Sequence, residues 1–366
     1  MLIQAAAALA QALSRAKPRI IPRLFDSTMW LCLAFCMSLW CAPAHAVKGL
    51  NVNELYHLAP SEVAVRVEAY RMLGVKWVRF DFDWSVIQPT PNTYNTAGYD
   101  VAVKALSAAG INVLGMIAYT PAWANGGQAT KFYPPTDPKA FARFAVFLVG
   151  RYAPLGVHTW EIWNEPNLAQ FWGPAPDPRA YAALLRATTP HIKERDSRAV
   201  VITGGLAQPG DSATTMDARL FLQLLYGSGA KYHFDAVGNH PYTSPQMPLD
   251  EGVTNWKKMY ATSISLLSIM RQYGDGHKRI WITEYGGPTS GIDAYGTVMT
   301  EHQQATMVAQ SLQTVADFAW AGPVFWYNFQ DFCATDPRRS SECFYGLLRS
   351  DGSPKPAYFA FKNAAQ

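Results

Sequence analysis

His158–Asn164 reads HTWEIWN, a short run of β-branched and aromatic residues that ends in a polar side chain. Such a run predicts a β-strand, and the longer periodic segment that follows it predicts a helix. Seven more runs of this kind lie along the chain: Gly49–Asn53, Val75–Phe80, Ile111–Ala118, Ala199–Thr203, Phe234–His240, Arg279–Glu284 and Pro323–Phe329. Eight strand–helix repeats predict an α/β fold, a (β/α)8 TIM barrel, in a single domain over residues 47–366.

The segments between these runs carry helix signals. Asp137-Pro138 and Asp177-Pro178 each combine a capping carboxylate with a proline at the first helical position. Glycines at 74 and 110 favour helix ends before them. The helices are therefore expected at Ser61–Leu73, Tyr99–Ala109, 138–152, Tyr181–Glu194, Ala218–Leu225, Asn255–Tyr273 and Glu301–Ala319.

The first 46 residues have the pattern of a secretory signal peptide. A basic region is followed by Met29–Cys41 (MWLCLAFCMSLWC), an apolar run too short to cross a bilayer comfortably. Ala44-His45-Ala46 then places small residues where a signal peptidase reads them. We expect cleavage after Ala46 and a secreted or periplasmic protein without a stable membrane span; an uncleaved signal anchor is the alternative.

Composition supports a folded, exported domain. Of the 366 residues, 49% are hydrophobic and 16% are charged, so the chain can bury a sizeable core. Residues 1–46 hold four Lys/Arg and one Asp, so without them the formal charge falls from +4 to about +1. This balance gives no electrostatic footprint for a nucleic acid partner.

Cysteine usage fits the same compartment. Three of the five cysteines lie within the first 46 residues, and only Cys333 and Cys343 remain beyond them. In an oxidising compartment these two are expected to form a disulfide, with two unpaired thiols as the alternative.

Two predicted strands end in glutamate. The fourth continues as Trp163-Asn164-Glu165-Pro166-Asn167 and the seventh as Thr283-Glu284-Tyr285-Gly286. In barrels of this kind the chemistry lies at the carboxyl ends of the strands, so both side chains are expected at one opening. Hydrolysis of a glycosidic bond needs such a pair: one carboxylic acid protonates the departing oxygen, and the other carboxylate attacks the anomeric carbon or activates water.

The segments WEIWNEPN and WITEYGG resemble those of the clan A retaining glycoside hydrolases, with family 39 and cellulase-like families the nearest likeness. The resemblance covers nearly the whole chain after residue 46. It implies that Glu165 is the general acid/base and Glu284 the nucleophile, which forms a covalent glycosyl-enzyme. It implies further that Asn164 bonds the sugar 2-hydroxyl, and that Arg79 keeps the nucleophile ionised.

The resemblance also assigns residues around the sugar. His240 and Tyr242 would line the subsite and orient Glu284, and Trp326 would form the floor beneath the sugar. Among the other tryptophans, Trp84, Trp123 and Trp172 lie in predicted loops or strand ends and are candidates for sugar stacking.

Each assignment has a structural alternative. A strand-end glutamate can be a salt-bridge partner, Arg79 can neutralise Asp81 or Asp83, and His240 can be a satisfied core histidine. Glu161 lies four residues before Glu165 on the same predicted face, one layer deeper, and is expected to be structural.

The resemblance implies that no metal or cofactor is needed, and the sequence lacks HExxH, Cys-x-x-Cys and a Gly-rich phosphate loop. The predicted partner is a β-linked oligo- or polysaccharide, with endo action on an exopolysaccharide or plant polysaccharide favoured over exo action. A monomer is favoured. The alternative function is a catalytically silent barrel that only binds carbohydrate.

Overall fold

The computed structural model describes residues 47–292, 296–334 and 338–364. The expected signal peptide, residues 1–46, lies outside this described part. Within it, no helix is both long enough and apolar enough to cross a membrane.

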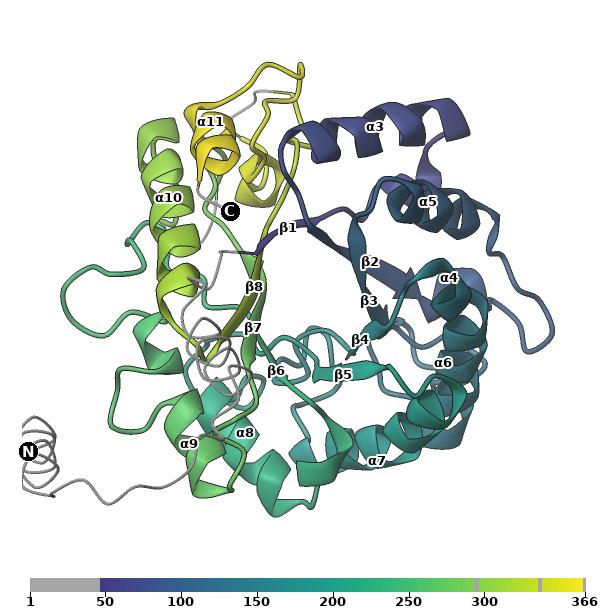
Figure 1. Cartoon of the computed structure of the whole chain (residues 1–366). Helices are drawn as coiled ribbons and strands as arrows, with labels where there is room; N and C mark the ends of the chain where they lie inside the picture. Colours follow the sequence, from purple (N-terminus) through teal and green to yellow (C-terminus); the bar gives the residue numbers. More distant parts are fainter. Residues whose placement is uncertain (1–46, 293–295, 335–337, 365–366) are drawn as a thin grey trace, which may run out of the picture. The chain divides into compact units, whose positions relative to one another are not determined.

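Eight parallel strands form a ring that helices surround (Figure 1). The strands are β1 Lys48–Asn51, β2 Trp77–Asp83, β3 Asn112–Ala118, β4 Thr159–Ile162, β5 Val200–Thr203, β6 Val237–Asn239, β7 Ile280–Tyr285 and β8 Ala321–Trp326. Their order is β5-β4-β3-β2-β1-β8-β7-β6, and the bridges Ile202↔Ala236 and Leu206↔Asn239 join the two ends. The (β/α)8 barrel predicted from the eight apolar runs is confirmed.

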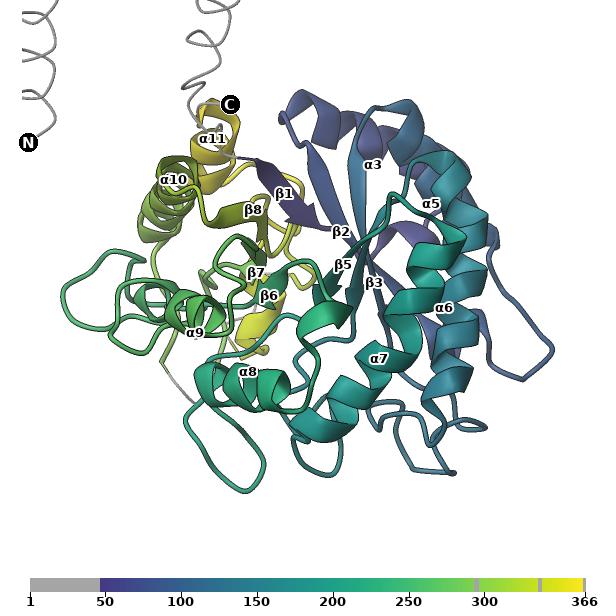
Figure 2. The same cartoon turned by 60° about the horizontal axis from the view of Figure 1, so that its bottom comes forward.

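Helices follow the strands on the outside. They are α3 Pro60–Met72, α4 Trp84–Ile87, α5 Ala97–Ala108, α6 Pro138–Tyr152, α7 Pro178–Arg195, α8 Ala218–Gly227, α9 Leu266–Gln272, α10 Glu301–Asp317 and α11 Pro356–Asn363. Short 3-10 turns occur at η1 Leu55–His57, η2 Ala153–Leu155, η3 Lys231–His233, η4 Lys257–Met259 and η5 Ser341–Phe344. In Figure 2, α10 and α11 lie side by side next to β1 and β8.

Two helix starts form as their sequences predict. The carboxylates of Asp137 and Asp177 accept backbone N–H groups in the first turns of α6 and α7. The helix expected over 255–273 is wrong in length. It begins only at Leu266, where Ser265 accepts the N–H of Ser268, and the segment before it folds as a loop with the turn η4.

Side chains that alternate along the strands fill the barrel below the end at which the strands finish. The inner layer holds Leu114, Ile202, Ala236 and Phe325, packed against Trp77, Val200 and Trp281. The Trp77 and Trp281 rings meet edge to face at 5.2 Å between centroids. Bulky apolar side chains thus close the barrel from below, so a substrate can reach its polar groups only from the opposite end.

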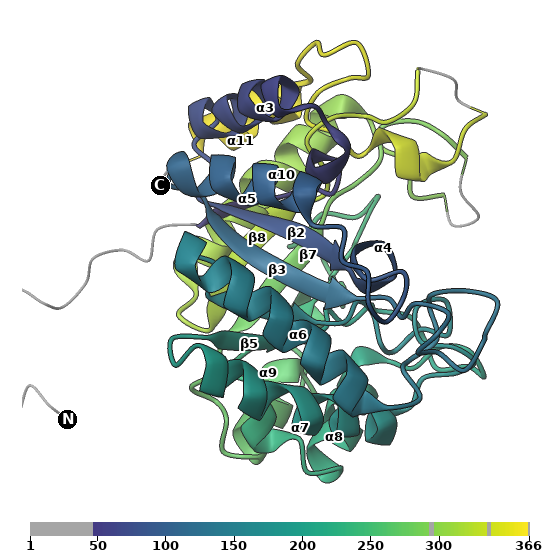
Figure 3. The ribbon, with the colours of Figure 1, turned by 90° about the vertical axis from the view of Figure 1, so that its right-hand side faces the viewer.

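That opposite end is where the strands finish. Figure 3 shows the arrowheads of β2 and β3 pointing toward α4 and a group of longer loops. Cys333 and Cys343 form the predicted disulfide in the loop between β8 and α11, with their Cα atoms 5.3 Å apart. The disulfide anchors η5 on this side of the molecule.

Candidate active site

The chain turns sharply after β4, and this turn brings Glu165 to the barrel opening. Trp163 and Glu165 have φ angles of 74° and 42°, in the left-handed region that non-glycine residues rarely adopt. The turn is held by Trp163 N–H on the Ile117 carbonyl at 2.8 Å and by Glu165 N–H on the Gly205 carbonyl at 3.1 Å. Backbone strain that neighbours hold in place is typical of functional sites.

Gly205, two residues after the end of β5, allows the backbone there to lie close to this turn. A Cβ atom at this position would lie 2.0 Å from Nε2 of His240, so only glycine fits. The Gly205 N–H donates to the buried carboxylate of Glu161 at 2.8 Å. Glu161 is fully buried and lies below the opening, as the alternation along β4 predicts.

Glu284 enters the site through an irregularity in β7. Between the pairs Ile282↔Val324 and Tyr285↔Trp326, β7 advances three residues while β8 advances two. The extra residue forms a bulge, and two consecutive side chains, Thr283 and Glu284, therefore face the barrel interior. Without the bulge, strict alternation would turn one of them toward the helices.

The two carboxylates lie close together and are open to solvent. One oxygen of Glu165, one of Glu284 and a ring nitrogen of His240 all lie within 4.8 Å of one another. The side chains of Glu165 and Glu284 are 13% and 15% exposed. This proximity favours a retaining glycosidase, whose carboxyl groups lie about 5–5.5 Å apart, over an inverting one, at about 6.5–9.5 Å.

Arg79 links Glu284 at the opening to the buried Glu161 below it. Its guanidinium, only 1% exposed, donates to Glu161 at 2.5 Å and to Glu284 at 2.6 Å. Further donors reach the side-chain oxygens of Asn164 at 2.8 Å and Asn51 at 3.1 Å. Asp81, the alternative partner, is more distant at 3.9 Å. The planar, fork-like geometry of arginine suits such simultaneous contacts.

His240 forms its shortest carboxylate contact with Glu165, and Tyr242 bonds to Glu284. Nδ1 of His240 lies 2.9 Å from Glu165 and 3.6 Å from Glu284, and Nε2 lies 3.0 Å from the hydroxyl of Thr283. The Tyr242 hydroxyl donates to Glu284 at 2.9 Å. Both ring nitrogens of His240 therefore have partners that fix the orientation of the ring.

The two glutamates differ in acidity. Burial raises the pKa of Glu165 above its ordinary value, and the charge of Glu284 adds to this, while His240 lowers it only in part. Burial also acts to raise the pKa of Glu284, but the charges of His240 and Arg79, with hydrogen bonds from Tyr242 and Arg79, hold it below its ordinary value. Such a pair supplies one protonated and one ionised carboxyl group at the same pH.

Glu165, His240 and Glu284 also have a spacing that could accommodate a metal ion. The ligand atoms of these residues already have hydrogen-bond partners within the protein. His240 bonds Glu165 and Thr283, and Glu284 accepts hydrogen bonds from Arg79 and Tyr242. The acidity of Glu165 and Glu284 is thus controlled by neighbouring side chains.

Two tryptophans predicted to contact sugar, Trp326 and Trp84, are buried in the packing around the barrel. Trp326 is 2% exposed, pairs with Leu50 on the outer side of the barrel and packs on Tyr285, because Phe325 takes the inward position in β8. Trp84 is fully buried against Phe144 of α6, because β2 extends to Asp83 and the chain then turns into α4.

The other two loop tryptophans differ from each other. Trp172 is 2% exposed and packs between Trp163 and Tyr181, so it belongs to the core. Trp123 is 38% exposed, and its indole N–H donates to the Gln88 carbonyl at 3.0 Å. Of the tryptophans proposed for stacking, Trp123 alone presents a substantial surface to solvent in the described residues.

Several groups at the site were missed from the sequence. Tyr327 comes two residues after the inward-facing Phe325; burial raises the pKa of its hydroxyl, and the charge of Glu284 adds to this. The Thr283 hydroxyl donates to Glu161 at 2.9 Å, and Asn51 donates to the Thr283 carbonyl at 3.1 Å. Burial raises the pKa of Asp81 to about 7. Inward alternation along β2 could have indicated Asp81, but the bulge in β7 leaves no signal in the sequence.

Comparisons with known proteins identify relatives in sequence and in fold. No family model matches the chain. It is 26% identical over 292 residues to a β-xylosidase of Geobacillus stearothermophilus, covering 73% of this chain and 55% of that protein. It is 23% identical over 317 residues to a β-xylosidase of Caldicellulosiruptor saccharolyticus, covering 79% and 62%. The chain thus spans between half and two thirds of the length of these relatives.

A solved family 39 glycoside hydrolase from Bacteroides cellulosilyticus has the same fold. The TM-score is 0.66 at 24% identity, and the match covers 88% of this chain and 64% of that chain. In sequence the chain is thus similar to two β-xylosidases, and in fold it is similar to a family 39 glycoside hydrolase.

Proposed function

We propose that this protein hydrolyses O-glycosidic bonds of a β-linked oligo- or polysaccharide with retention of configuration. The observation that carries the proposal is the pair Glu165 and Glu284, whose oxygens lie within 4.8 Å at the barrel opening and whose pKa values are shifted in opposite directions. Two β-xylosidases among its relatives support the same reaction class.

The reaction proceeds in two steps. Glu284 attacks the anomeric carbon while Glu165 donates its proton to the departing glycosidic oxygen, which leaves a covalent glycosyl-enzyme. Glu165, now ionised, takes a proton from water, and that water releases the sugar from Glu284. The Asn164 amide, whose oxygen accepts from Arg79, keeps its NH2 group for the sugar 2-hydroxyl.

We further propose endo action within a polysaccharide. The support is the exposed aromatic surface of the loops at this end of the barrel, where Trp123 and Phe332 are 38% and 60% exposed. Exposed rings suit contacts with successive sugar units along a chain.

The test is a panel of 4-nitrophenyl β-glycosides and β-linked polysaccharides incubated with residues 47–366. Reducing ends should form, NMR should show the β-anomer first, and mass spectrometry of the products should show a range of lengths. Inversion would overturn the double-displacement mechanism. Binding without any hydrolysis would favour the silent carbohydrate-binding barrel.

We also propose that residues 1–46 are an export signal removed after Ala46. The apolar run Met29–Cys41 and the disulfide Cys333–Cys343 support this, because disulfides persist in oxidising compartments. Intact mass of the protein recovered from the periplasm or medium of a Gram-negative bacterial host should correspond to an N-terminus at Val47. A mature protein that begins at Met1 would contradict cleavage.

A further inference from the structure

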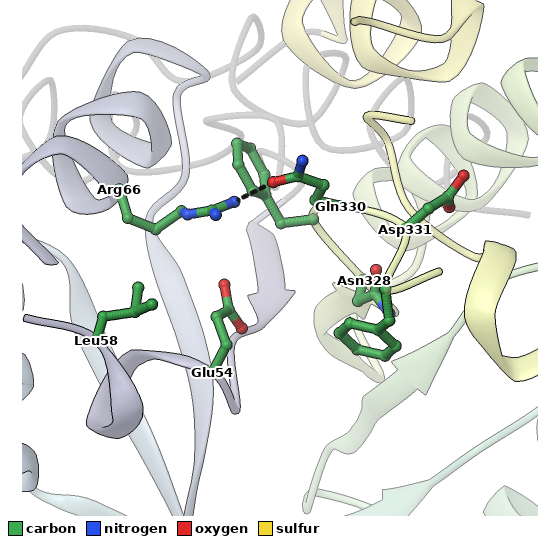
Figure 4. A pocket seen from close by; sticks show the side chains of 8 residues that line it. Glu54, Leu58, Arg66, Asn328, Gln330 and Asp331 are labelled. Atoms are coloured by element: carbon green, nitrogen blue, oxygen red, sulfur yellow. Dashed lines mark hydrogen bonds between the residues drawn. The ribbon is translucent and has the colours of Figure 1, made fainter. Parts of the chain in front are cut away.

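A small hollow lies beside the catalytic opening, between the segment after β1 and the segment after β8 (Figure 4). Its volume is about 200 Å³, and its walls are Glu54, Leu58, Arg66, Asn328, Phe329, Gln330, Asp331 and Phe332. Sites for drug-sized ligands have about 300–1,000 Å³. This hollow therefore suits a single sugar ring better than a longer ligand.

Two chain connections place the hollow near the catalytic groups. Asn51, the last residue of β1, accepts a hydrogen bond from Arg79, and Glu54 follows three residues later. Asn328 directly follows Tyr327, whose ionisation is affected by the charge of Glu284. Both walls thus continue from strands that end at the catalytic opening.

Asn328 is the group that points to a ligand. It is 4% exposed, and neither its side-chain oxygen nor its nitrogen has a hydrogen-bond partner. In Figure 4 it lies between Glu54 and Asp331. A buried amide normally has partners, because leaving its groups unpaired costs about 1–3 kcal/mol. One donor group and one acceptor at the hollow match the vicinal hydroxyls of a sugar.

The other walls are fixed in place. Arg66 donates to Gln330 at 2.8 Å, and its guanidinium lies over the Phe329 ring at 5.1 Å. The Glu54 carboxylate accepts from the Tyr70 hydroxyl at 2.6 Å. Asp331 accepts from the ammonium of Lys355 at 2.9 Å. Polar side chains held by such second contacts are preorganised for binding.

Apolar surface surrounds these polar groups. Phe332 is 60% exposed, and a second hollow of about 450 Å³ shares Leu58, Arg66 and Phe329 with the first. Aromatic rings beside amide and carboxylate groups are the combination that binds the apolar face and hydroxyl edge of a sugar ring.

We propose that this hollow is a subsite for one sugar unit of the substrate chain, distant from the bond that is cleaved. The inference rests on the proposed glycosidase function and deepens it. Occupancy of the hollow lengthens the stretch of polysaccharide that the protein recognises and favours long substrates over short ones.

The experiment measures kcat/KM for xylo-oligosaccharides from the disaccharide to the hexasaccharide, together with 4-nitrophenyl β-xyloside. If another sugar is cleaved faster in the panel, the same series of that sugar is used. The variants are Asn328→Leu and Phe332→Ala. The control is Phe359→Ala, which removes a phenylalanine of similar exposure, 51%, on α11.

Each site variant should lower kcat/KM on the hexasaccharide about tenfold, mainly through KM, and change the nitrophenyl glycoside less than twofold. Asn328→Leu should leave Tm unchanged or higher, because it removes unpaired polar atoms at similar volume. The control should match the wild type on every substrate.

Hydrolysis whose length dependence is the same in the site variants and the control would overturn the subsite. A drop in Tm for Asn328→Leu, with equal losses on short and long substrates, would make Asn328 structural and overturn it as well. If Asn328→Leu does not fold, Phe332→Ala decides alone. Failure of the wild type to cleave any glycan would instead overturn the proposed function, and the subsite with it.

Discussion

The ends of β4 and β7 each supply a glutamate, but the protein surrounds the two carboxylates differently. Glu165 lies at a strained turn, with His240 as its hydrogen-bond partner at 2.9 Å. Glu284 lies at a bulge and accepts hydrogen bonds from Arg79 and Tyr242. Identical side chains therefore acquire different roles from the number of cationic and hydroxyl groups that face them.

The largest expected effect comes from the end of β7. Glu284→Ala should lower kcat by about 10⁴- to 10⁶-fold, because it removes the carboxylate on which the covalent intermediate is proposed to form. Added azide should restore part of the rate and yield a glycosyl azide of inverted configuration, detected by NMR. A variant that retains a tenth of the activity would show that Glu284 is not the nucleophile.

Changing the end of β4 should have a smaller effect that depends on the leaving group. Glu165→Gln should reduce turnover of natural oligosaccharides about 10²- to 10⁴-fold, since their leaving oxygen needs a proton. Aryl glycosides with acidic phenols should lose much less in the first step, which burst kinetics can resolve. Glu194→Gln, an exposed change on α7, is the matched control and should match the wild type. Equal losses for both leaving groups would contradict the role of general acid.

Arg79→Lys tests the charge that distinguishes the two ends. Lysine keeps the charge but cannot make the contacts to Glu161, Glu284 and Asn164 at once. We expect a loss of about 10²-fold in kcat/KM and an acidic limb of the pH profile displaced to higher pH. Arg71→Lys, whose salt bridge with Glu68 is exposed on α3, should change neither. An unchanged acidic limb would show that Arg79 does not control the ionisation of Glu284.

The smallest expected effect is a shift in pH dependence. Activity needs Glu284 ionised and Glu165 protonated, so kcat/KM should be bell-shaped, with apparent pKa values that belong to the pair. The charge of His240 lowers the pKa of both glutamates. His240→Asn should therefore move both limbs to higher pH, by about half a unit or more. A shift toward lower pH would contradict this electrostatic role.

The fold and the two glutamates were within reach of sequence reasoning. The eight strands have clear apolar runs, and parallel strands of a barrel must end at the same face. For that reason Glu165 and Glu284 could be placed at one opening without knowledge of their distance. Asp-Pro pairs likewise located the starts of α6 and α7.

The remaining errors arise where alternation fails at strand ends. An extra residue in β7 brings Thr283 inward beside Glu284, and an extension of β2 by three residues turns Trp84 into the helix layer. The sequence of β8 shows the aromatic pair Trp326-Tyr327 but not which of the two side chains points into the barrel. Trp326 was therefore predicted to contact the sugar, whereas Tyr327 is the one affected by the charge of Glu284. Register depends on contacts with neighbouring strands, which a single sequence does not reveal.

The bulge in β7 also limits how this barrel can change. A strand of regular pleat offers one side chain to the interior for every two residues, whereas here Thr283 and Glu284 are both available to it. Deletion of one residue from this strand would rotate the nucleophile into the hydrophobic layer under the helices, with the rest of the barrel intact. Substitutions can tune the reaction at this position gradually, but a one-residue deletion would end it in a single step.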